Sequence, residues 1–271
     1  CLTMTATPIP RTLSLIIYGD LDLSILDEMP KGRQKTETYL VTPDIRERSY
    51  AYIKKHLCQG RQGYIVCSLV EEGETSELTA ANELFKELSD GFFKGFKLGL
   101  LHGKMKAAEK KAVMDSFASG ETQLLVATTV IEVGIDVPNA VIMVIENAER
   151  FGLSQLHQLR GRIGRGSEKS TCILISEADE TERLNVLAST TDGFKIADED
   201  LKLRGPGDFF GSRQHGLPEM KIANMMTDGE VIKETRDAAE KLLKNNPALA
   251  GEDFEMLRKA VNRLFAGGSM N

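Results

Sequence analysis

Two arginines near the middle of the chain are spaced as a phosphate-binding pair would be. They belong to the run Q-L-H-Q-L-R-G-R-I-G-R over residues 155–165. If this run is one helix, a polar stripe faces away from an apolar one and consists of Gln155, Gln158, Arg162 and Arg165. Guanidinium groups match phosphate oxygens bidentately, and an arginine from a neighbouring domain can stabilise the charge that develops in phosphoryl transfer. Arg162 and Arg165 are therefore candidate phosphate ligands, and the alternative is a solvated basic helix face.

Polar residues also follow the ends of expected β-strands. Thr128 comes directly after an apolar run and offers a hydroxyl where a helix could begin, which suits a phosphate. Asp136 stands between Ile135 and Val137, either as a ligand or as an ordinary turn aspartate. His102 and Gly103 follow another apolar run and precede two lysines, so they contact DNA phosphate or merely begin a helix.

The elements that must position these residues alternate between strands and helices. Short apolar runs rich in β-branched residues predict strands over 35–41, 64–70, 96–101, 123–127, 141–145 and 171–175. Apolar residues at helical spacing predict helices over 44–59, 79–88 and 107–118. This alternation predicts an α/β domain over residues 35–178 with a doubly wound parallel sheet.

The pattern changes after residue 178, where no convincing strand remains. Residues 204–218 hold four glycines and two prolines, as in a structured turn region or a linker. Apolar residues recur every three to four positions over 231–243 and 254–265, which predicts two amphipathic helices. We therefore expect residues 179–271 to form a small helical appendage that packs on the α/β domain.

Composition limits the class of protein. The net charge is −6, the wrong sign for a broad DNA-binding surface, so any DNA contact must be local. No apolar run reaches the roughly 20 residues that cross a bilayer, and residues near the N-terminus lack the basic-then-apolar pattern of a signal peptide, so a cytoplasmic protein without a membrane partner is expected. The four cysteines lack C-x-x-C spacing, which argues against a zinc site, and no metal ligands are proposed.

Several runs resemble the motifs of superfamily 2 helicases. Q-L-R-G-R-I-G-R over 158–165 resembles motif VI, L-V-A-T-T-V-I-E-V-G-I-D-V-P-N-A over 125–140 resembles motif V, and Thr5-Ala6-Thr7 resembles motif III. D-L-K-L-R-G-P-G-D-F-F-G-S-R-Q-H-G-L-P over 200–218 resembles the translocation motif shared by RecG and the transcription-repair coupling factor. Pro206 and the Q-H-G-L-P ending favour the RecG family. The chain thus resembles the C-terminal part of a RecG-type helicase, which implies a RecA-like fold.

The resemblance implies roles for individual residues. Arg162 and Arg165 would reach the γ-phosphate of ATP held on the other motor half, with Gly134 and Asp136 near its ribose and phosphates. Thr128 would approach the DNA backbone, where His102 and Gly103 are further candidates. The residues that would couple nucleotide state to DNA movement are Gln158, Thr5, Thr7, Arg204 and Gln214. For the tail residues among these, DNA contact or turn capping stays open as an alternative.

Two motifs of a complete motor are absent. No G-x-x-x-x-G-K-[ST] phosphate loop occurs, and the acidic pair Asp27-Glu28 follows the motif III match although a Mg²⁺-binding motif should precede it. We therefore expect ATP and Mg²⁺ to be bound mainly by another motor half, and this chain to be inactive alone. Because it opens with Cys1 inside a motif, residues 1–34 are interpreted as the end of that first half and a linker.

The resulting hypothesis is a RecG-like motor domain that acts on branched or forked DNA, with the N-terminal part of its parent chain as partner. The apolar stretches 13–18 and 21–26 would then fold back on the core or promote self-association. The alternatives are a coupling-factor translocase, disfavoured by L-R-G-P-G at 203–207, and a non-catalytic nucleic-acid-binding module. The second is disfavoured because such a module needs no γ-phosphate clamp.

Overall fold

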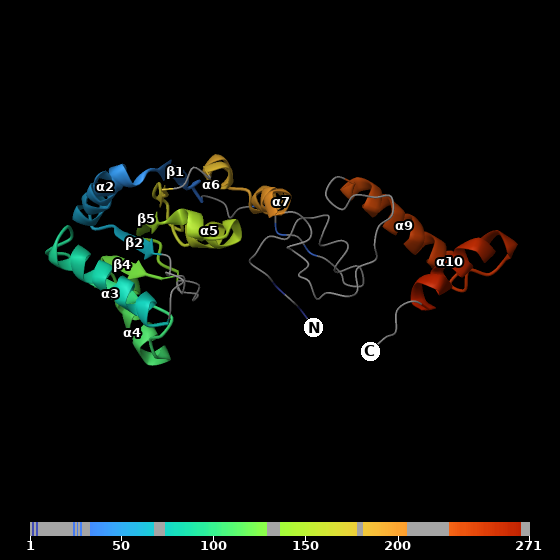
Figure 1. Cartoon of the computed structure of the whole chain (residues 1–271), viewed down its shortest axis with the longest axis horizontal. Coiled ribbons are helices and arrows are strands. Elements are labelled where there is room, and N and C mark those ends of the chain that lie inside the picture. The colour runs from blue at the N-terminus through green and yellow to red at the C-terminus, as the bar shows by residue number, and fades with distance from the viewer. Residues whose placement is uncertain are drawn as a thin grey trace. The chain divides into compact units, whose positions relative to one another are not determined.

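The computed structural model describes residues 33–67, 74–128, 136–177, 181–204 and 228–266, with isolated positions 2, 4, 24, 26 and 28 (Figure 1). The chain divides into two compact units. Of the described elements, the first unit contains the sheet and the helices around it, and the second contains the helices after residue 228.

A six-stranded sheet forms the centre of the first unit. Its strands lie in the order β1-β6-β5-β2-β4-β3, and every neighbouring pair is parallel. The strands are β1 (Glu37–Val41), β2 (Gln62–Cys67), β3 (Leu98–Leu101), β4 (Leu124–Ala127), β5 (Ala140–Glu146) and β6 (Thr171–Ile175). The predicted parallel sheet is confirmed, with the first and third strands shorter than expected.

Helices cover both faces of this sheet, as in a doubly wound fold. They are α2 (Arg46–Cys58), α3 (Glu74–Asp90), α4 (Ala107–Ala118), α5 (Leu153–Arg160), α6 (Thr181–Ser189) and α7 (Gly193–Arg204). Single 3-10 turns, η1 (Pro43–Ile45) and η3 (Ala148–Arg150), precede α2 and α5. Side chains of α2, of α3 and of the region after α3 pack in one apolar cluster, and those of α4 to α7 pack in another. Adjacent residues of β2 divide between them, Tyr64 in one and Ile65 in the other.

Helices α6 and α7 extend the first unit beyond residue 178. Both pack on α5, and α6 also lies against β1. Leu184, Leu187 and Ile196 are buried in the same cluster as the sheet. Neither helix was predicted from the sequence, although each carries apolar residues three or four positions apart. Their buried side chains belong to the core of the first unit.

The second unit contains α9 (Gly229–Asn245), the 3-10 turn η4 (Glu252–Phe254) and α10 (Glu255–Ala266). The helix predicted over 231–243 falls within α9, and the one predicted over 254–265 matches α10 except that its first residue belongs to η4. Their apolar residues include Val231, Leu243, Met256 and Leu257, which are exposed. Among the described residues, no helix is both long enough and apolar enough to span a bilayer.

Candidate functional site

The parallel sheet places the candidate residues at its two opposite edges. His102 and Gly103 follow β3, and Thr128 follows β4, so all three lie at the carboxyl edge. Asp136 precedes β5, and the pair Arg162 and Arg165 precedes β6, so these three lie at the amino edge. Because β4 and β5 run in the same direction, the chain between Thr128 and Asp136 connects one edge to the other. One motif therefore supplies residues to both edges.

Helix α5 ends at Arg160, earlier than the sequence analysis assumed. Gly161 caps it, and Gly164 has φ of +68°, a left-handed conformation that no helix can continue through. The prediction that Arg162 and Arg165 share a helix face with Gln158 is therefore wrong, because both arginines lie in the loop after α5. The predicted apolar stripe is confirmed, since the following three side chains are buried: Leu156, Leu159 and Ile163.

Backbone hydrogen bonds give this loop a defined shape. The amide of Arg162 donates to the Leu159 carbonyl at 2.9 Å, and that of Ile163 donates to the Arg160 carbonyl at 3.3 Å. Gly164 donates to the Ala140 carbonyl at 3.3 Å, which ties the loop to the start of β5. We call residues 161–170 the arginine loop.

Arg165 joins the arginine loop to Asp136. Its Nε donates to the Gly161 carbonyl at 3.1 Å, and its Nη1 lies 3.3 Å from an Asp136 carboxylate oxygen. The Arg165 side chain is 29% exposed and that of Asp136 is 62% exposed, so solvent screens this ion pair. The structure thus brings together residues from the two motif-like runs.

The charges of this group also act on a buried tyrosine of β2. Burial raises the pKa of the Tyr64 hydroxyl to about 12. The positive charges of Arg162 and Arg165 lower this pKa, and the negative charge of Asp136 raises it. The pKa of this tyrosine therefore responds to the charges of the arginine loop and of Asp136.

Three buried polar atoms without a hydrogen-bond partner among the described residues follow the carboxyl ends of strands. They are Oγ1 of Thr128, a residue 1% exposed, Nδ1 of His102 and Oε2 of Glu149, which lies just after β5. The Thr128 amide donates to the Leu101 carbonyl at 3.0 Å, which links the ends of β4 and β3. Lys110 Nζ donates to the Gly103 carbonyl at 2.6 Å. Buried polar atoms generally have partners, so the carboxyl edge could accept one from a ligand or an adjoining segment.

The other candidate residues are placed only in part. Gln158 lies on α5 and is half-buried. Arg204 is the last residue of α7, and its side chain lies outside the described part of the chain. The candidates that fall outside the described residues altogether are Thr5, Thr7, Gly134 and Gln214.

Arg160 is an important residue that the sequence analysis did not single out. It is 3% exposed, and its Nη1 donates to the carbonyls of Leu187 at 2.6 Å and Thr190 at 2.9 Å, at the end of α6. Its Nη2 lies 3.2 Å from His157 Nδ1. The sequence feature that could have identified Arg160 as buried is its position seven residues after Leu153, on the same apolar side of the helix. Arg160 is therefore buried against protein carbonyls, whereas Arg165, which is 29% exposed, also reaches the Asp136 carboxylate.

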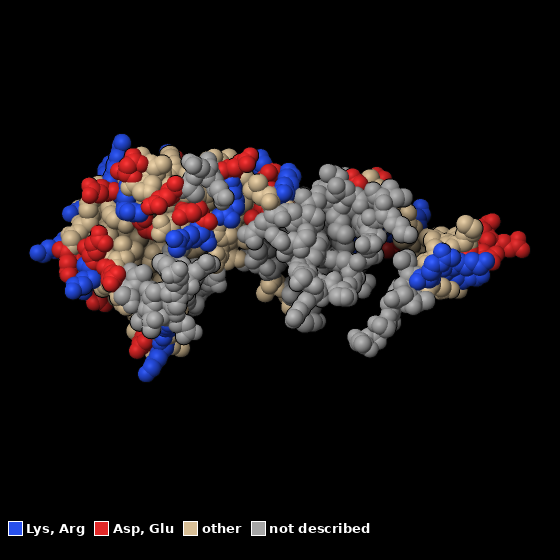
Figure 2. Space-filling view, viewed as in Figure 1, with Lys and Arg blue, Asp and Glu red and all other residues tan. Residues whose placement is uncertain are grey.

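Charges of both signs are interspersed over the first unit on the face shown in Figure 2, without one broad basic area. Among the described residues, no group of three or more acids, histidines or cysteines could hold a metal ion.

Acidification is expected to destabilise the first unit through His157. Burial, followed by the positive charge of Arg160, lowers the pKa of His157 to about 4. Between the usual histidine pKa of about 6.5 and this value, the unfolded chain binds a proton that the folded chain does not. Stability should therefore fall as the pH falls through this window. The free energy of unfolding, measured with urea at about pH 7.5 and about pH 5, should fall by roughly 1–2 kcal/mol more in the wild type than in His157→Gln. An equal fall in both proteins would contradict the lowered pKa of His157.

Replacement of Gly164 is expected to distort the arginine loop. A Cβ at this position would overlap the Ser170 hydroxyl and lie 3.0 Å from Thr36 Oγ1, in addition to the strain of φ +68°. Gly60 has φ of +76° but nothing within 4 Å of such a Cβ, so Gly60→Ala isolates the backbone strain. We expect Gly60→Ala to lower the free energy of unfolding by about 1 kcal/mol and Gly164→Ala to lower it by roughly 2 kcal/mol more, as measured with urea. An equal decrease in both variants would contradict the expected effect of crowding at Ser170.

Comparisons with known proteins agree with this arrangement. Residues 47–167 match the helicase conserved C-terminal domain, and residues 190–266 match the C-terminal part of domain 3 of the ATP-dependent DNA helicase RecG. The described edge residues, from His102 to Arg165, fall within the first match, and Arg204 and Gln214 fall within the second.

Two curated relatives have about half of their aligned residues identical to this chain. An ATP-dependent DNA helicase RecG from Synechocystis sp. is 51% identical over 251 residues, which cover 92% of this chain and 30% of the relative. The RecG of Bacillus subtilis is 48% identical over 260 residues, covering 95% of this chain and 38% of the relative. The chain therefore spans about a third of the length of these relatives.

A solved structure of RecG bound to a three-way DNA junction matches with a TM-score of 0.67 and 46% identity. The match covers 84% of this chain and 30% of that chain. It confirms the predicted RecA-like helicase fold.

Proposed function

Because the chain belongs to the RecG family of ATP-dependent DNA helicases in the part that it spans, we propose that it forms the second motor domain of such an enzyme. The observation that carries this proposal is the ion pair of Arg165 with Asp136 at the amino edge of the sheet, in the same loop as Arg162. Within a helicase domain, such a cationic edge suits the phosphates of ATP held on a facing motor domain.

The amino edge fits the nucleotide by charge. The guanidinium groups of Arg162 and Arg165 would bind the γ-phosphate, and Asp136 and Gly134 would lie near the ribose and phosphates. Until a phosphate is present, Asp136 holds Arg165 through their 3.3 Å ion pair. When bound, ATP supplies the phosphoanhydride bond whose hydrolysis drives movement. The described residues offer no site for Mg²⁺, which we assign mainly to the facing domain together with most of the ATP contacts.

The carboxyl edge is the proposed DNA side. Thr128, His102 and Gly103 would contact the DNA backbone, and the partnerless Thr128 hydroxyl supports this placement. The chain from Thr128 to Asp136 connects this edge to the nucleotide edge, so a displacement of one edge can move the other. Further coupling is proposed for Gln158, Thr5, Thr7, Arg204 and Gln214.

The substrate and partners are proposed from the relatives. We expect the parent helicase to remodel branched DNA, such as stalled forks and Holliday junctions, during repair and recombination in the bacterial cytoplasm. Its physical partner is the N-terminal part of its own chain, and in the isolated chain the apolar stretches before residue 34 would either fold back on the core or cause non-physiological self-association. The relatives named above are RecG helicases, so neither a coupling-factor translocase nor a non-catalytic module is favoured.

The proposal is tested by DNA-stimulated ATP hydrolysis. The 271-residue chain alone is expected to be silent, whereas the full-length protein should hydrolyse ATP and respond more strongly to forked than to linear duplex DNA. Hydrolysis by the chain alone would show that the nucleotide site is not divided between two domains. A silent full-length protein would contradict the helicase assignment itself.

A further inference from the structure

A short segment before β1 lies along the whole arginine loop. Arg33 Nη2 donates to the Gly161 carbonyl at 3.3 Å, and Gln34 Nε2 donates to the Ser167 carbonyl at 2.9 Å. The hydroxyl groups of Thr36 and Ser170 are hydrogen-bonded at 2.9 Å, and the Glu37 amide donates to the Ser170 carbonyl at 3.0 Å. Residues 33–37, which we call the entry segment, thus contact the loop at its beginning and its end.

One carbonyl oxygen connects the entry segment to Arg165. The Gly161 carbonyl accepts from Arg33 Nη2 at 3.3 Å and from Arg165 Nε at 3.1 Å. Hydrogen bonds from charged donors are stronger than neutral ones. A shift of the Gly161 carbonyl would therefore move the Arg165 guanidinium, and removal of Arg33 would leave the carbonyl with Arg165 as its remaining charged donor.

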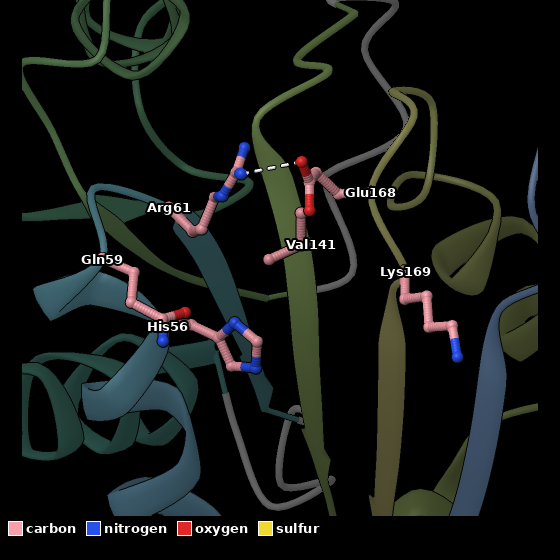
Figure 3. Close-up of a pocket in the computed structure, with 6 residues that line it drawn as sticks. All are labelled: His56, Gln59, Arg61, Val141, Glu168 and Lys169. Carbon is pink, nitrogen blue, oxygen red and sulfur yellow. Dashed lines mark ion pairs between the residues drawn. The ribbon is translucent and has the colours of Figure 1, made fainter.

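The second half of the arginine loop is fixed from another direction. Arg61, just before β2, forms an ion pair with Glu168 at 2.8 Å, and Figure 3 shows the two side chains pointing toward one another. Lys169, which precedes β6, follows directly. Arg33 is instead bonded to Gly161, in the first half of the loop, which also contains Arg162 and Arg165.

We propose that Arg33 is a positioning residue that sets the orientation of Arg165 toward the nucleotide. The inference rests on the proposed function. There the entry segment leads into the second motor domain, so a movement of the first motor domain pulls on the Gly161 carbonyl. Arg33 would then transmit domain closure to Arg165 without contacting ATP.

The first test separates positioning from nucleotide binding in the full-length protein. Arg33→Ala is expected to lower kcat for DNA-stimulated ATP hydrolysis about 10-fold and to change KM for ATP less than about 2-fold. Arg33→Lys, which retains one charged donor, should recover part of kcat. Arg48→Ala, on the exposed side of α2, is the matched control and should behave as the wild type. An unchanged kcat in Arg33→Ala overturns the inference.

The second test needs no activity. Hydrogen–deuterium exchange on the 271-residue chain should show faster exchange of the amides of residues 162–164 in Arg33→Ala, with β2 and β5 unchanged. Unchanged loop exchange overturns the inference even if kcat falls. If wild type and Arg48→Ala both lack ATPase activity, the proposed function fails, and the exchange result alone decides whether Arg33 orders the loop.

Discussion

Arg162→Ala and Arg165→Ala are each expected to lower kcat for DNA-stimulated ATP hydrolysis by the full-length protein by about 10³-fold or more. An arginine that reaches the transferred phosphoryl group from a facing domain contributes about 10³- to 10⁵-fold to kcat. The two residues occupy one short loop beside Asp136, so each should matter separately. Steady-state kinetics with saturating forked DNA measures the effect.

Lysine variants and an exposed arginine provide the controls. Arg162→Lys and Arg165→Lys keep the charge but lose the planar fork, so they should recover only part of kcat. Arg48→Ala should leave kcat unchanged. Binding of forked DNA without nucleotide should be retained in all these variants, because the proposed DNA residues lie at the opposite edge of the sheet. A loss of DNA binding with intact kcat would contradict the assignment of the two edges.

Arg160→Ala should lower the free energy of unfolding of the first unit by about 3 kcal/mol, although Arg160 is only two residues from Arg162. The substitution leaves the carbonyls of Leu187 and Thr190 without their guanidinium donor. It also empties a buried space beside α6, whose last turn benefits from a positive charge. Urea unfolding that follows the first unit measures the loss.

Two further substitutions identify the cause of this loss of stability. Arg160→Lys should recover part of the stability, because an ammonium cannot donate to both carbonyls in the planar geometry of a guanidinium. Arg48→Ala should change stability by less than about 0.5 kcal/mol, as exposed substitutions do. If Arg160→Ala proves as stable as the wild type but has lost kcat, Arg160 acts on the nucleotide and its structural role is wrong.

The contrast among the three arginines explains how one short run serves two purposes. Arg160 is directed inward because α5 still continues at that point and its buried stripe passes through residue 160. Helix α5 ends at Arg160, and the arginine loop that begins at Gly161 places Arg162 and Arg165 at the amino edge. The position of the helix end therefore decides which arginines can bind a phosphate.

Much of this protein was determined by the sequence itself. Continuous apolar runs rich in β-branched residues indicate strands of a parallel sheet, so all six strands were located, and β6 and α4 have the predicted bounds. The motif-like runs also led directly to Arg162, Arg165 and Asp136. These features depend on residue type and local spacing, which the sequence displays.

Only the tertiary structure decided the rest. The end of α5 depends on the left-handed Gly164, which is held near Ser170 and Thr36. The burial of Arg160 depends on carbonyls about 30 residues later, and the bond from Arg33 to Gly161 joins residues 128 positions apart. Such contacts form when parallel strands bring distant segments to the same edge, and no local periodicity encodes them.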